Sequence, residues 1–540
     1  MRAANSPPMR SLDPRKIPIR LAMLAVLGAL ASGCATLRTD LPREPSTALA
    51  PVADTPSTRY VASETNAHGG ASGFRALISN TNALMSRIVL IDHAEHSLDL
   101  QYYIFDNDAT GRLVAQRILA AADRGVRVRI LLDDLDIAGQ GQDNVLDALD
   151  AHPNIEVRLF NPFRIRNRSI FSKIGQFVVD GKRLNRRMHN KSFIVDGMQA
   201  VIGGRNIGDA YFDAGDQVHF RDLDVLAIGP VVPKISAMFD RYWNSDMSYP
   251  VTAYTSIRAD AADLAHVRVA LAHDARAFAD SDYAQALSET LPDGPSADRK
   301  GYWYWGPARL VADDPDKADP DRDGTTRQIG SQLRPMLDGA TSEALLISPY
   351  FIPGDNGVKY LADMARRGVT IKVLTNALAA TDEPEVHAGY AHYRIPLLEA
   401  GIDLFELRPA PGRPPHYSYG TSSGESLHAK SMIVDKRMVF VGSMNLDPRS
   451  RKLNTEMGII VDCPELAAAL SKYFDSATAP ENAFHVVLER PDGDPSSKPV
   501  LRWIAVDDGK PVTFDHDPET SALKRMRVQM MRVLPIEDQL

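Results

Sequence analysis

One short pattern occurs twice in this chain and constrains its fold more than any other feature. His, Lys, Asp, Gly and Asn follow one another at the same spacing in residues 189–206 and again 239 positions later, in residues 428–445. Such a repeat is typical of a duplicated structural unit. The members are His189, Lys191, Asp196, Gly203 and Asn206 in the first copy, and His428, Lys430, Asp435, Gly442 and Asn445 in the second.

The sequence around the two copies repeats as well. Strand-like runs at 97–105 and 344–352 are each followed by a helical stretch, a glycine and a second strand-like run. Strand, helix and strand in this order are typical of a βαβ unit with parallel strands. We therefore predict an α/β fold of two homologous lobes, with mixed, largely parallel sheets flanked by helices and packed around one shared site.

Composition along the 540 residues divides the chain further. We expect a signal peptide, a lipidated cysteine with a flexible tether, a first lobe, a connecting segment, a second lobe and a C-terminal extension. The predicted boundaries are 1–33, 34–73, 74–250, 251–330, 331–485 and 486–540.

The N-terminus has the features of an export signal. Residues 1–20 are basic, residues 21–30 are uncharged and apolar, and small residues directly precede Cys34. The apolar run is too short to span a bilayer core of about 30 Å. Small residues before a cysteine resemble a bacterial lipoprotein signal, which is cut before the cysteine that then carries lipid. An ordinary secretory signal or a transmembrane stub is the alternative.

The resemblance to a lipoprotein implies a location. The protein would be lipid-anchored in the bacterial cell envelope and face the periplasm. Ala35 stands where an Asp would resemble the inner-membrane retention signal of some lipoproteins, so the outer membrane is mildly favoured.

Each copy of the repeat has a predictable local geometry. Residues 191–195 are β-prone, and Asp196-Gly197 is typical of a two-residue hairpin turn. Because side chains alternate along a strand, His and Lys of each copy point the same way. The hairpin would place the small residue, Gly204 or Ser443, opposite the histidine, with room for a ligand beside the imidazole.

Two sets of His, Lys and Asn predict a phosphodiester site. Lysine charge and asparagine amides bind the non-bridging oxygens. One histidine attacks phosphorus, while the other protonates the leaving oxygen and later activates an incoming hydroxyl. Because the lysines supply the charge, we expect neither a metal ion nor another cofactor. Asp196 and Asp435 lie at the turns, and we predict that their role is structural.

A cluster of acidic and histidine residues at 382–392 raises the alternative of a metal site. Its histidines, His387 and His392, are five residues apart, which is poor spacing for one face of a helix. We interpret the cluster as a polar wall of a cleft.

The paired motifs resemble those that define the phospholipase D superfamily, and they match at every defining position. The runs 445–450 and 453–456 look like bacterial cardiolipin synthases. The runs 375–383, 386–390 and 534–540 look like the branch called cardiolipin synthase C. The resemblance covers residue 74 to the end of the chain.

The resemblance implies a two-step reaction through a phosphohistidine. His189 would be the nucleophile and His428 the general acid and base. An acidic residue downstream of each asparagine would orient a histidine; Glu456 and Asp222 fit, although Asp224 stays open as the alternative to Asp222. The residues that would bind phosphate are Lys191, Lys430, Asn206, Asn445, Gly204 and Ser443.

Four functions follow from these observations. The first is transfer of a phosphatidyl group to a lipid hydroxyl, as in cardiolipin synthesis, and the second is hydrolysis to phosphatidic acid. The third is a nuclease, which the net charge of −8 disfavours. The fourth is a lipid-binding lipoprotein without activity, which two intact motifs disfavour. Phosphatidylglycerol and phosphatidylethanolamine present the same diester, so either is a possible donor.

A basic segment suggests where a membrane would bind. Residues 160–191 hold nine Lys or Arg residues, one acidic residue, Asp180, and four phenylalanines. Basic charge with apolar bulk suits an anionic membrane surface. It suits nucleic acid equally well, and a solvated loop is a third interpretation. The lipoprotein signal favours phospholipids, so we expect no nucleic acid partner.

Overall fold

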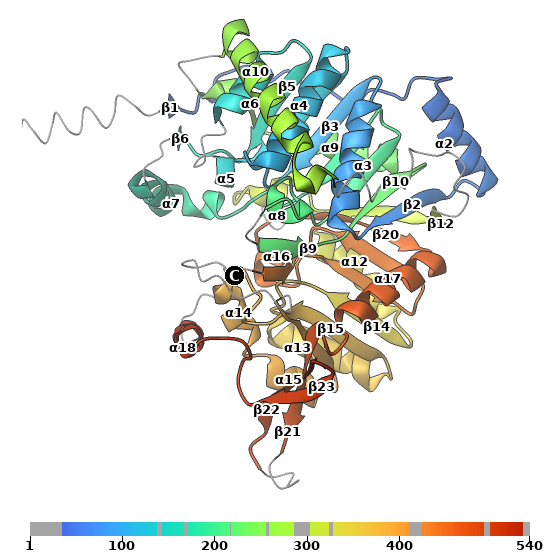
Figure 1. Cartoon of the computed structure of the whole chain (residues 1–540), viewed down its shortest axis with the longest axis vertical. Coiled ribbons are helices and arrows are strands. Elements are labelled where there is room, and N and C mark those ends of the chain that lie inside the picture. Colours follow the sequence, from blue (N-terminus) through green and yellow to red (C-terminus); the bar gives the residue numbers. More distant parts are fainter. Residues whose placement is uncertain are drawn as a thin grey trace, which may run out of the picture.

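The structure of the chain is a computed structural model. It describes residues 35–137, 143–166, 170–215, 218–254, 259–285, 303–322, 328–409, 424–490 and 497–532. The predicted signal peptide and Cys34 lie outside the described residues. Figure 1 shows two lobes stacked along the long axis, with the first half of the chain in the upper lobe and the second half in the lower one.

The first lobe is built on a nine-stranded sheet. Its strands are β2 (Ser72–Leu77), β3 (Ser97–Tyr102), β4 (Arg127–Asp133), β5 (Ile155–Phe160), β7 (Ser192–Val195), β8 (Gln199–Gly203), β10 (Asp224–Ile228), β11 (Ser248–Pro250) and β12 (Tyr304–Gly306). They lie in the order β11-β5-β4-β3-β7-β8-β10-β2-β12.

The second lobe is built on a ten-stranded sheet. Its strands are β13 (Ala308–Ala312), β14 (Glu343–Ile347), β15 (Thr370–Asn376), β16 (Asp403–Leu407), β18 (Ser431–Val434), β19 (Met438–Gly442), β20 (Met457–Asp462), β21 (Ala483–Glu489), β22 (Val500–Asp507) and β23 (Lys510–Phe514). They lie in the order β13-β20-β19-β18-β14-β15-β16-β21-β22-β23.

The two sheets share one topology. The order β5-β4-β3-β7-β8-β10 in the first lobe corresponds strand for strand to β16-β15-β14-β18-β19-β20 in the second. The prediction of two homologous α/β lobes with mixed sheets is confirmed. The expectation that the sheets are largely parallel is wrong: in each sheet only three adjacent strands, β3-β4-β5 or β14-β15-β16, are parallel. The motif hairpin and its return strand add antiparallel neighbours, because short turns can only join antiparallel strands.

Helices cover both faces of each sheet. On the first lobe α3 (Asn80–Asp92), α4 (Ala109–Asp123), α6 (Asp143–Asp150) and α10 (Ala261–Ala279) form one layer. On the second lobe α12 (Ile329–Asp338), α13 (Gly354–Arg366) and α15 (Arg394–Glu399) do the same. The remaining helices of the described residues are α2 (Pro56–Ala67), α5 (Asp134–Ile137), α7 (Ile170–Leu184), α8 (Asp209–Phe212), α9 (Val232–Trp243), α14 (Pro384–Tyr390), α16 (Pro448–Lys452), α17 (Pro464–Ala477), α18 (Ala522–Met531), and the 3-10 turns η1 (Val251–Ala253) and η2 (Pro315–Ala318).

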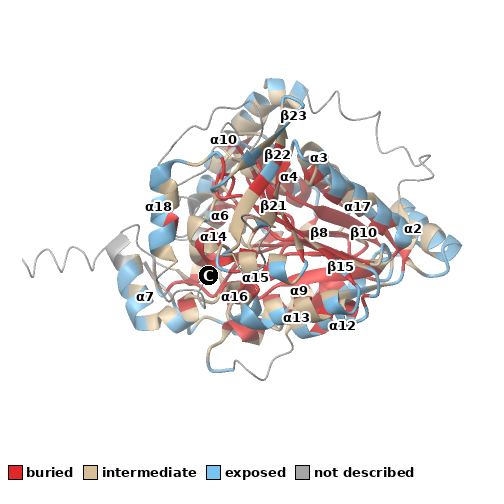
Figure 2. Ribbon diagram, turned by 90° about the horizontal axis from the view of Figure 1, so that it is seen from below, coloured by how far each residue is buried: buried red, intermediate tan, exposed pale blue. Residues whose placement is uncertain are grey.

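The lobes share part of their hydrophobic core. One cluster of buried side chains draws on both sheets and on α9 and α17, which pack against the strands that carry the motifs. Figure 2 shows the buried residues concentrated in these strands, with exposed residues on the outer helices. Because burial of apolar surface is the main favourable term in folding, a common core fixes the lobes relative to each other.

Two short strand pairs complete the fold. β9 (Val218–Arg221) of the first lobe pairs in parallel with β17 (Gly424–Leu427) of the second. β1 (Ala35–Thr36) pairs with β6 (Ile165–Arg166). The first pair is a direct backbone link between the lobes, and it lies at their junction in Figure 1.

Part of the predicted flexible tether, 34–73, is held against the first lobe. The Ala48 N–H donates to the carboxylate of Asp240, and Arg129 donates to the Ser46 carbonyl. These contacts satisfy backbone groups that a free segment would leave to water. The tether prediction is therefore corrected for these residues, and α2 is a regular helix within the same range.

The segments outside the two predicted lobes also add strands to the sheets. β12 and β13, from the connecting segment 251–330, extend the first and the second sheet. β22 and β23, from the C-terminal extension, form the edge of the second sheet. Within the part of the chain that the structure describes, no helix is both long and apolar enough to cross a membrane.

Candidate active site

Each motif forms a β-hairpin, β7–β8 or β18–β19, with a three-residue turn. Val195 pairs with Gln199, and both Asp196 and Gly197 have positive φ, 52° and 66°. Residues 196–198 form the turn, so the predicted two-residue turn is wrong by one residue. Continued from the pair Ser192–Ile202, this register puts Gly203 opposite Lys191 and Gly204 opposite Asn190, whereas we predicted Gly204 opposite His189.

The motif aspartates close the hairpins at the end away from the histidines. Asp196 accepts hydrogen bonds from the backbone N–H groups of residues 95–97, at 2.7–3.0 Å. Asp435 accepts equivalent bonds from residues 341–343. Each carboxylate thus ties its hairpin to the start of the neighbouring antiparallel strand, β3 or β14.

Each motif histidine is held by a carboxylate from the other lobe. His189 Nδ1 lies 2.9 Å from Glu456 Oε2, and His428 Nδ1 lies 2.5 Å from Asp222 Oδ2. Asp224 points elsewhere and pairs with Arg87 at 2.8 Å. The open choice between Asp222 and Asp224 is therefore decided by contact: Asp222 is the residue beside a motif histidine.

Backbone hydrogen bonds between the lobes position these pairs. The His189 N–H donates to the Thr455 carbonyl at 2.9 Å, directly before Glu456. The His428 N–H donates to the Arg221 carbonyl at 2.8 Å, directly before Asp222. Each histidine and its carboxylate are therefore aligned by the backbone as well as by their side chains.

The motif lysines are buried beside the histidines. Lys191 Nζ donates to the His189 carbonyl at 2.8 Å, and Lys430 Nζ donates to the His428 carbonyl. Burial, more than the nearby Glu and Asp residues can offset, lowers the pKa of Lys430 to about 8. Burial and the charge of Lys430 also lower the pKa of Lys191. The two lysines are thus buried and close enough for their charges to interact.

The motif asparagines differ in their partners. Asn206 accepts from the Ile104 N–H at 3.2 Å and donates to the Tyr211 hydroxyl at 2.7 Å. The side-chain oxygen of Asn445 is buried and has no hydrogen-bond partner among the described residues. Because oxygen and nitrogen of an amide are assigned by their partners, either end of Asn445 can face a ligand.

The small residues of the motifs contact the carboxylates. A Cβ at Gly204 would lie 2.2 Å from Asp222 Oδ1, so a side chain there would displace that carboxylate. The Ser443 hydroxyl donates to Glu456, as does Ser450 at 2.7 Å. The two positions therefore hold the carboxylates in place by different means, one by leaving space and one by a hydrogen bond.

The two carboxylates have different electrostatic surroundings. Burial raises the pKa of Glu456 to about 7, in spite of Lys191 and the two serines. Burial also acts on Asp222, but His428 and Lys430 outweigh it and hold the pKa of that carboxyl below its usual range. Asp222 is thus a firmly ionised partner for His428.

Both histidines are neutral in the free protein. Burial and the charge of Lys430 lower the pKa of His428 to about 3, although Asp222 acts in the opposite direction. Burial and then Lys191 and Lys430 lower the pKa of His189 well below its usual value. With Nδ1 on a carboxylate, each neutral ring carries its free electron pair on Nε2.

Two positioning residues were not predicted from the sequence. Asp133, at the end of β4, accepts from the Met188 N–H at 2.8 Å, and Asn376, at the end of β15, accepts from the Leu427 N–H at 2.8 Å. Each therefore holds the residue before a motif histidine. The available signal was a polar residue at the carboxyl end of the corresponding buried strand in each repeat.

The acidic and histidine residues at 382–392 have separate partners and do not form one cluster of ligands. His387 Nε2 lies 2.9 Å from Arg394, and Arg527 pairs with Glu385. No group of three or more His, Cys, Asp or Glu side chains suited to a metal ion occurs among the described residues.

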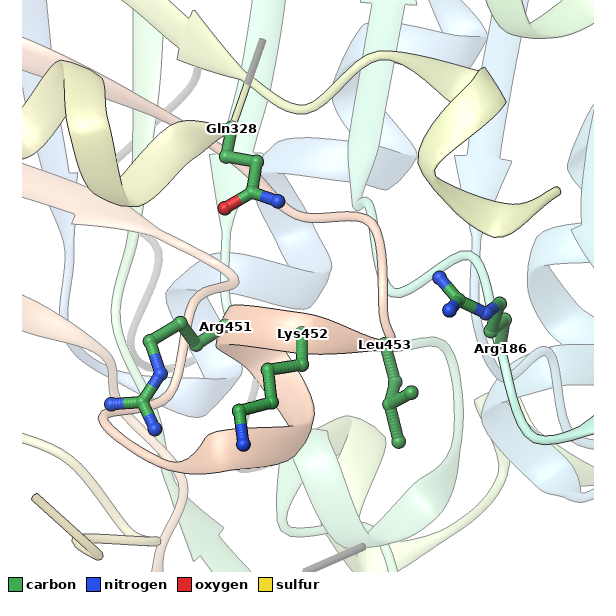
Figure 3. A pocket seen from close by; sticks show the side chains of 5 residues that line it. All are labelled: Arg186, Gln328, Arg451, Lys452 and Leu453. Atoms are coloured by element: carbon green, nitrogen blue, oxygen red, sulfur yellow. The ribbon is translucent and has the colours of Figure 1, made fainter. Parts of the chain in front are cut away.

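A basic cavity of about 460 Å³ lies where the two lobes meet (Figure 3). Arg186 comes from the first lobe, three residues before His189. Arg451 and Lys452 are the last residues of α16 in the second lobe, Leu453 follows them, and Gln328 precedes α12. Three cationic side chains around one cavity make this part of the junction attractive to anions.

Comparison with known proteins agrees with this architecture. A family model described as cardiolipin synthase, PLD-like domain, matches residues 88–243 and 333–478. Cardiolipin synthase C of Escherichia coli (strain K12) is 40% identical over 484 residues, which cover 87% of this chain and 96% of that protein. A cardiolipin synthase of Staphylococcus aureus (strain N315) is 24% identical over 388 residues, 71% of this chain and 63% of that protein.

A solved structure shows the same fold. The crystal structure of phosphatidylserine synthase from Haemophilus influenzae Rd KW20 superposes with a TM-score of 0.54, at 12% identity, over 90% of this chain and all of that one. At that identity the likeness concerns the fold alone. The repeated match of the family model and the high identity over most of the chain show that this protein belongs to the cardiolipin synthase family with phospholipase D-like domains.

Proposed function

We propose that this protein is a phosphatidyltransferase that moves a phosphatidyl group from one phospholipid to a hydroxyl of another and forms cardiolipin through a phosphohistidine. The observation that carries the proposal is the pair of histidines whose Nδ1 atoms rest on carboxylates of opposite lobes. That geometry leaves two Nε2 atoms at one site, as a double displacement at phosphorus requires.

In the first step His189 attacks phosphorus and His428 acts as the acid. The His189 Nε2–P bond forms as the bond between phosphorus and the headgroup oxygen breaks, and His428 gives its Nε2 proton to that oxygen. Because the pKa of free His428 is about 3, it needs help to hold this proton. The bound anionic phosphodiester offsets the charge of Lys430, which is the second-largest cause of the lowered pKa, and so raises the pKa of His428.

In the second step the roles of His428 reverse. His428 Nε2 takes the proton of the acceptor hydroxyl, whose oxygen attacks phosphorus while the bond to His189 breaks. Asp222 favours the imidazolium that forms on His428, because its carboxylate is ionised and directly bonded to the ring. This asymmetry between the carboxylates supports the assignment of acid and base to His428 and of nucleophile to His189.

The site is built to stabilise charge on the non-bridging oxygens. Lys191 and Lys430 supply buried positive charge, which is stronger there than in water. Asn445, with one unpartnered amide atom, and Asn206 add amide groups. We propose that Gly204 and Ser443 line the phosphate position as well. With this charge in place, no metal ion is needed for the reaction.

We propose that the protein works at a membrane surface, anchored through Cys34 in the bacterial envelope and facing the periplasm. Two helices on one side of the molecule, α7 and α18, support contact with lipid (Figures 1 and 2). Val178 and Val179 of α7 are 81% and 88% exposed, with cations on the same helix, and α18 exposes Leu523 at 70% in a helix without acidic residues. Exposed apolar side chains beside cations suit anionic lipid.

Two measurements test the membrane assignment. Mass spectrometry of the native protein reveals whether Cys34 carries lipid; an unmodified cysteine would refute the anchor. Sedimentation with phosphatidylglycerol vesicles compares the wild type with the Val178→Asp, Val179→Asp double variant. We expect weaker sedimentation of the variant, and equal sedimentation would refute a role for α7.

One assay tests the proposed reaction. The purified protein is incubated with vesicles of phosphatidylglycerol, with and without phosphatidylethanolamine, and the products are identified by mass spectrometry. Cardiolipin is the expected product, and the released headgroup, glycerol or ethanolamine, identifies the donor. Phosphatidic acid alone would replace the proposal by hydrolysis. If no lipid product formed, both transfer and hydrolysis would be refuted, and a nuclease or a lipid-binding protein would remain as alternatives.

A further inference from the structure

A half-buried carboxylate near the site has one shielded oxygen without a hydrogen-bond partner among the described residues. Asp382 lies in the loop after β15, and its Oδ2 accepts from the Tyr350 hydroxyl at 2.8 Å. Its Oδ1 is shielded from solvent and has no hydrogen-bond partner among the described residues. A buried carboxylate oxygen without a partner is costly, so this atom is prepared for a donor that arrives with a ligand.

The topology places this carboxylate at the active site. Tyr350 follows β14 and Asp382 follows β15, and the carboxyl ends of these parallel neighbours lie at one edge of the sheet. The same edge holds Asn376, which bonds Leu427 next to His428.

Further contacts connect the segments after β14 and β15 to the second motif. The Ser348 hydroxyl accepts from the Leu446 N–H, directly after Asn445, at 3.0 Å. Asp382 is also close enough to Lys430 and Tyr211 for their charges to interact, and the Tyr211 ring packs edge-on at 5.3 Å against that of His428. Asp382 therefore lies on the His428 side of the site, where the leaving oxygen departs and the acceptor enters.

The arrangement breaks the symmetry of the lobes. The bridges Phe105–Ile207 and Phe351–Leu446 are equivalent, so Tyr350 occupies the position of Ile104 in the first lobe. An aliphatic side chain cannot orient a carboxylate. At the position of Ile104 the first lobe has no hydroxyl, so the Tyr350–Asp382 pair belongs to the second lobe's side, where the two half-reactions exchange one alcohol for another.

We infer that Asp382 Oδ1, oriented by Tyr350, accepts a hydrogen bond from a glycerol hydroxyl of the acceptor headgroup and so selects a polyol over water. The inference rests on the proposed transfer reaction. A hydroxyl fits better than an ammonium group, because Lys430 already places a cation nearby. A second hydroxyl held by Asp382 orients the attacking one toward phosphorus, whereas water has no second point of attachment.

The test measures how the phosphohistidine divides between alcohol and water. Asp382→Ala, Asp382→Asn and Tyr350→Phe are compared with the wild type on phosphatidylglycerol vesicles, and Glu383→Gln is the matched control one residue away. We expect the ratio of cardiolipin to phosphatidic acid to fall about tenfold in Asp382→Ala, the loss of one bond to a charged group. Total donor consumption should change by less than about threefold.

The outcomes separate this inference from the proposed function. A wild type that forms no cardiolipin refutes the function itself. A folded Asp382→Ala protein with an unchanged product ratio refutes the inference alone, and so does an equal loss in Glu383→Gln. A lower ratio in Asp382→Asn, which keeps the size of the side chain, would support it further. Thermal unfolding of each variant shows whether the fold is retained. As a further control, 1-butanol replaces the lipid acceptor. Because 1-butanol lacks a second hydroxyl, Asp382→Ala and the wild type should use it equally well.

Discussion

The two lobes have the same strand order and the same motif, yet their carboxylates behave differently. Glu456 of the second lobe, beside His189, has a pKa raised by burial to about 7. Asp222 of the first lobe, beside His428, stays ionised because His428 and Lys430 outweigh burial. The comparison shows that duplication supplied a symmetric scaffold, while neighbouring charges made the two histidines chemically distinct.

The lobes also exchange their carboxylates. Each histidine lies on a hairpin of its own lobe, and the acid that orients it comes from the opposite one. Neither lobe therefore contains a complete histidine–carboxylate pair. The chemistry belongs to the junction, which the shared core and the β9–β17 pair keep rigid.

The largest effect should come from the histidines. His189→Ala and His428→Ala should each lower turnover by at least about 10³-fold, as loss of a nucleophile or of an acid and base does. A donor with a 4-nitrophenol leaving group, which needs no acid, separates the roles. His428→Ala should still release a burst of nitrophenol and accumulate phosphohistidine, and His189→Ala should not. The reverse pattern would exchange the two assignments.

The second-largest loss of turnover should come from substitution of the carboxylates that orient the histidines. Asp222→Asn and Glu456→Gln should each reduce kcat by about 10²–10³-fold, because a histidine without its carboxylate loses its tautomer and orientation. Single-turnover assays should show slower phosphohistidine formation in Glu456→Gln and slower transfer to the acceptor in Asp222→Asn. The exposed Glu489→Gln serves as the control and should match the wild type. Equal effects of both variants on both steps would contradict the difference between the lobes.

A smaller effect concerns pH. Lys430 has a pKa lowered to about 8, so the free protein loses this positive charge as the pH rises above that value. Because protonation of His428, whose pKa in the free protein is about 3, also limits kcat/KM, we expect the decline of kcat/KM with pH to steepen above pH 8 by a further factor of about ten per pH unit. Bound phosphodiester stabilises the charged lysine, so the decline in kcat should occur at higher pH. A kcat/KM profile whose slope does not change between pH 7 and pH 10 would argue against a charged Lys430 in substrate binding.

The smallest effect on turnover should come from substitution of the motif aspartates, one in each lobe. Asp196→Ala and Asp435→Ala each remove a carboxylate that binds three consecutive backbone N–H groups. We expect a loss of about 1–3 kcal/mol in the free energy of unfolding for each, measured with urea, and more for the better buried Asp196. Turnover of the folded fraction should stay within a few-fold. A selective loss of turnover without a loss of stability would give these residues a catalytic role.

Much of the fold followed from local patterns in the sequence. Spacing alone revealed the duplication, and the βαβ flanks predicted the three parallel strands of each sheet. The sequence did not reveal that antiparallel pairs dominate, because strands such as β2 and β13 join the sheets from distant parts of the chain. Local turn propensity also misplaced the hairpin register by one residue, since the conformation at Met198 is not encoded by Asp196-Gly197.

The site was predictable in its members more than in its connections. His189 and Lys191 follow from the motif, but the pairing of Glu456 with His189 depends on how the lobes pack. The same holds for Asp222. The sequence could not distinguish it from Asp224, because only the folded structure shows that Asp222 contacts His428 and that Asp224 contacts Arg87. Asp133 and Asn376 escaped notice because the backbone groups that they bind, before each motif histidine, cannot be identified from the sequence.

The exchange of carboxylates has a consequence for inheritance. A substitution at Glu456 in the second half impairs the histidine of the first half, and a substitution at Asp222 does the converse. Neither half can drift toward a separate role without disabling the other, so selection acts on the two copies as a single unit. The duplicated halves are in this sense no longer spare copies of each other, but interlocked parts that must change together.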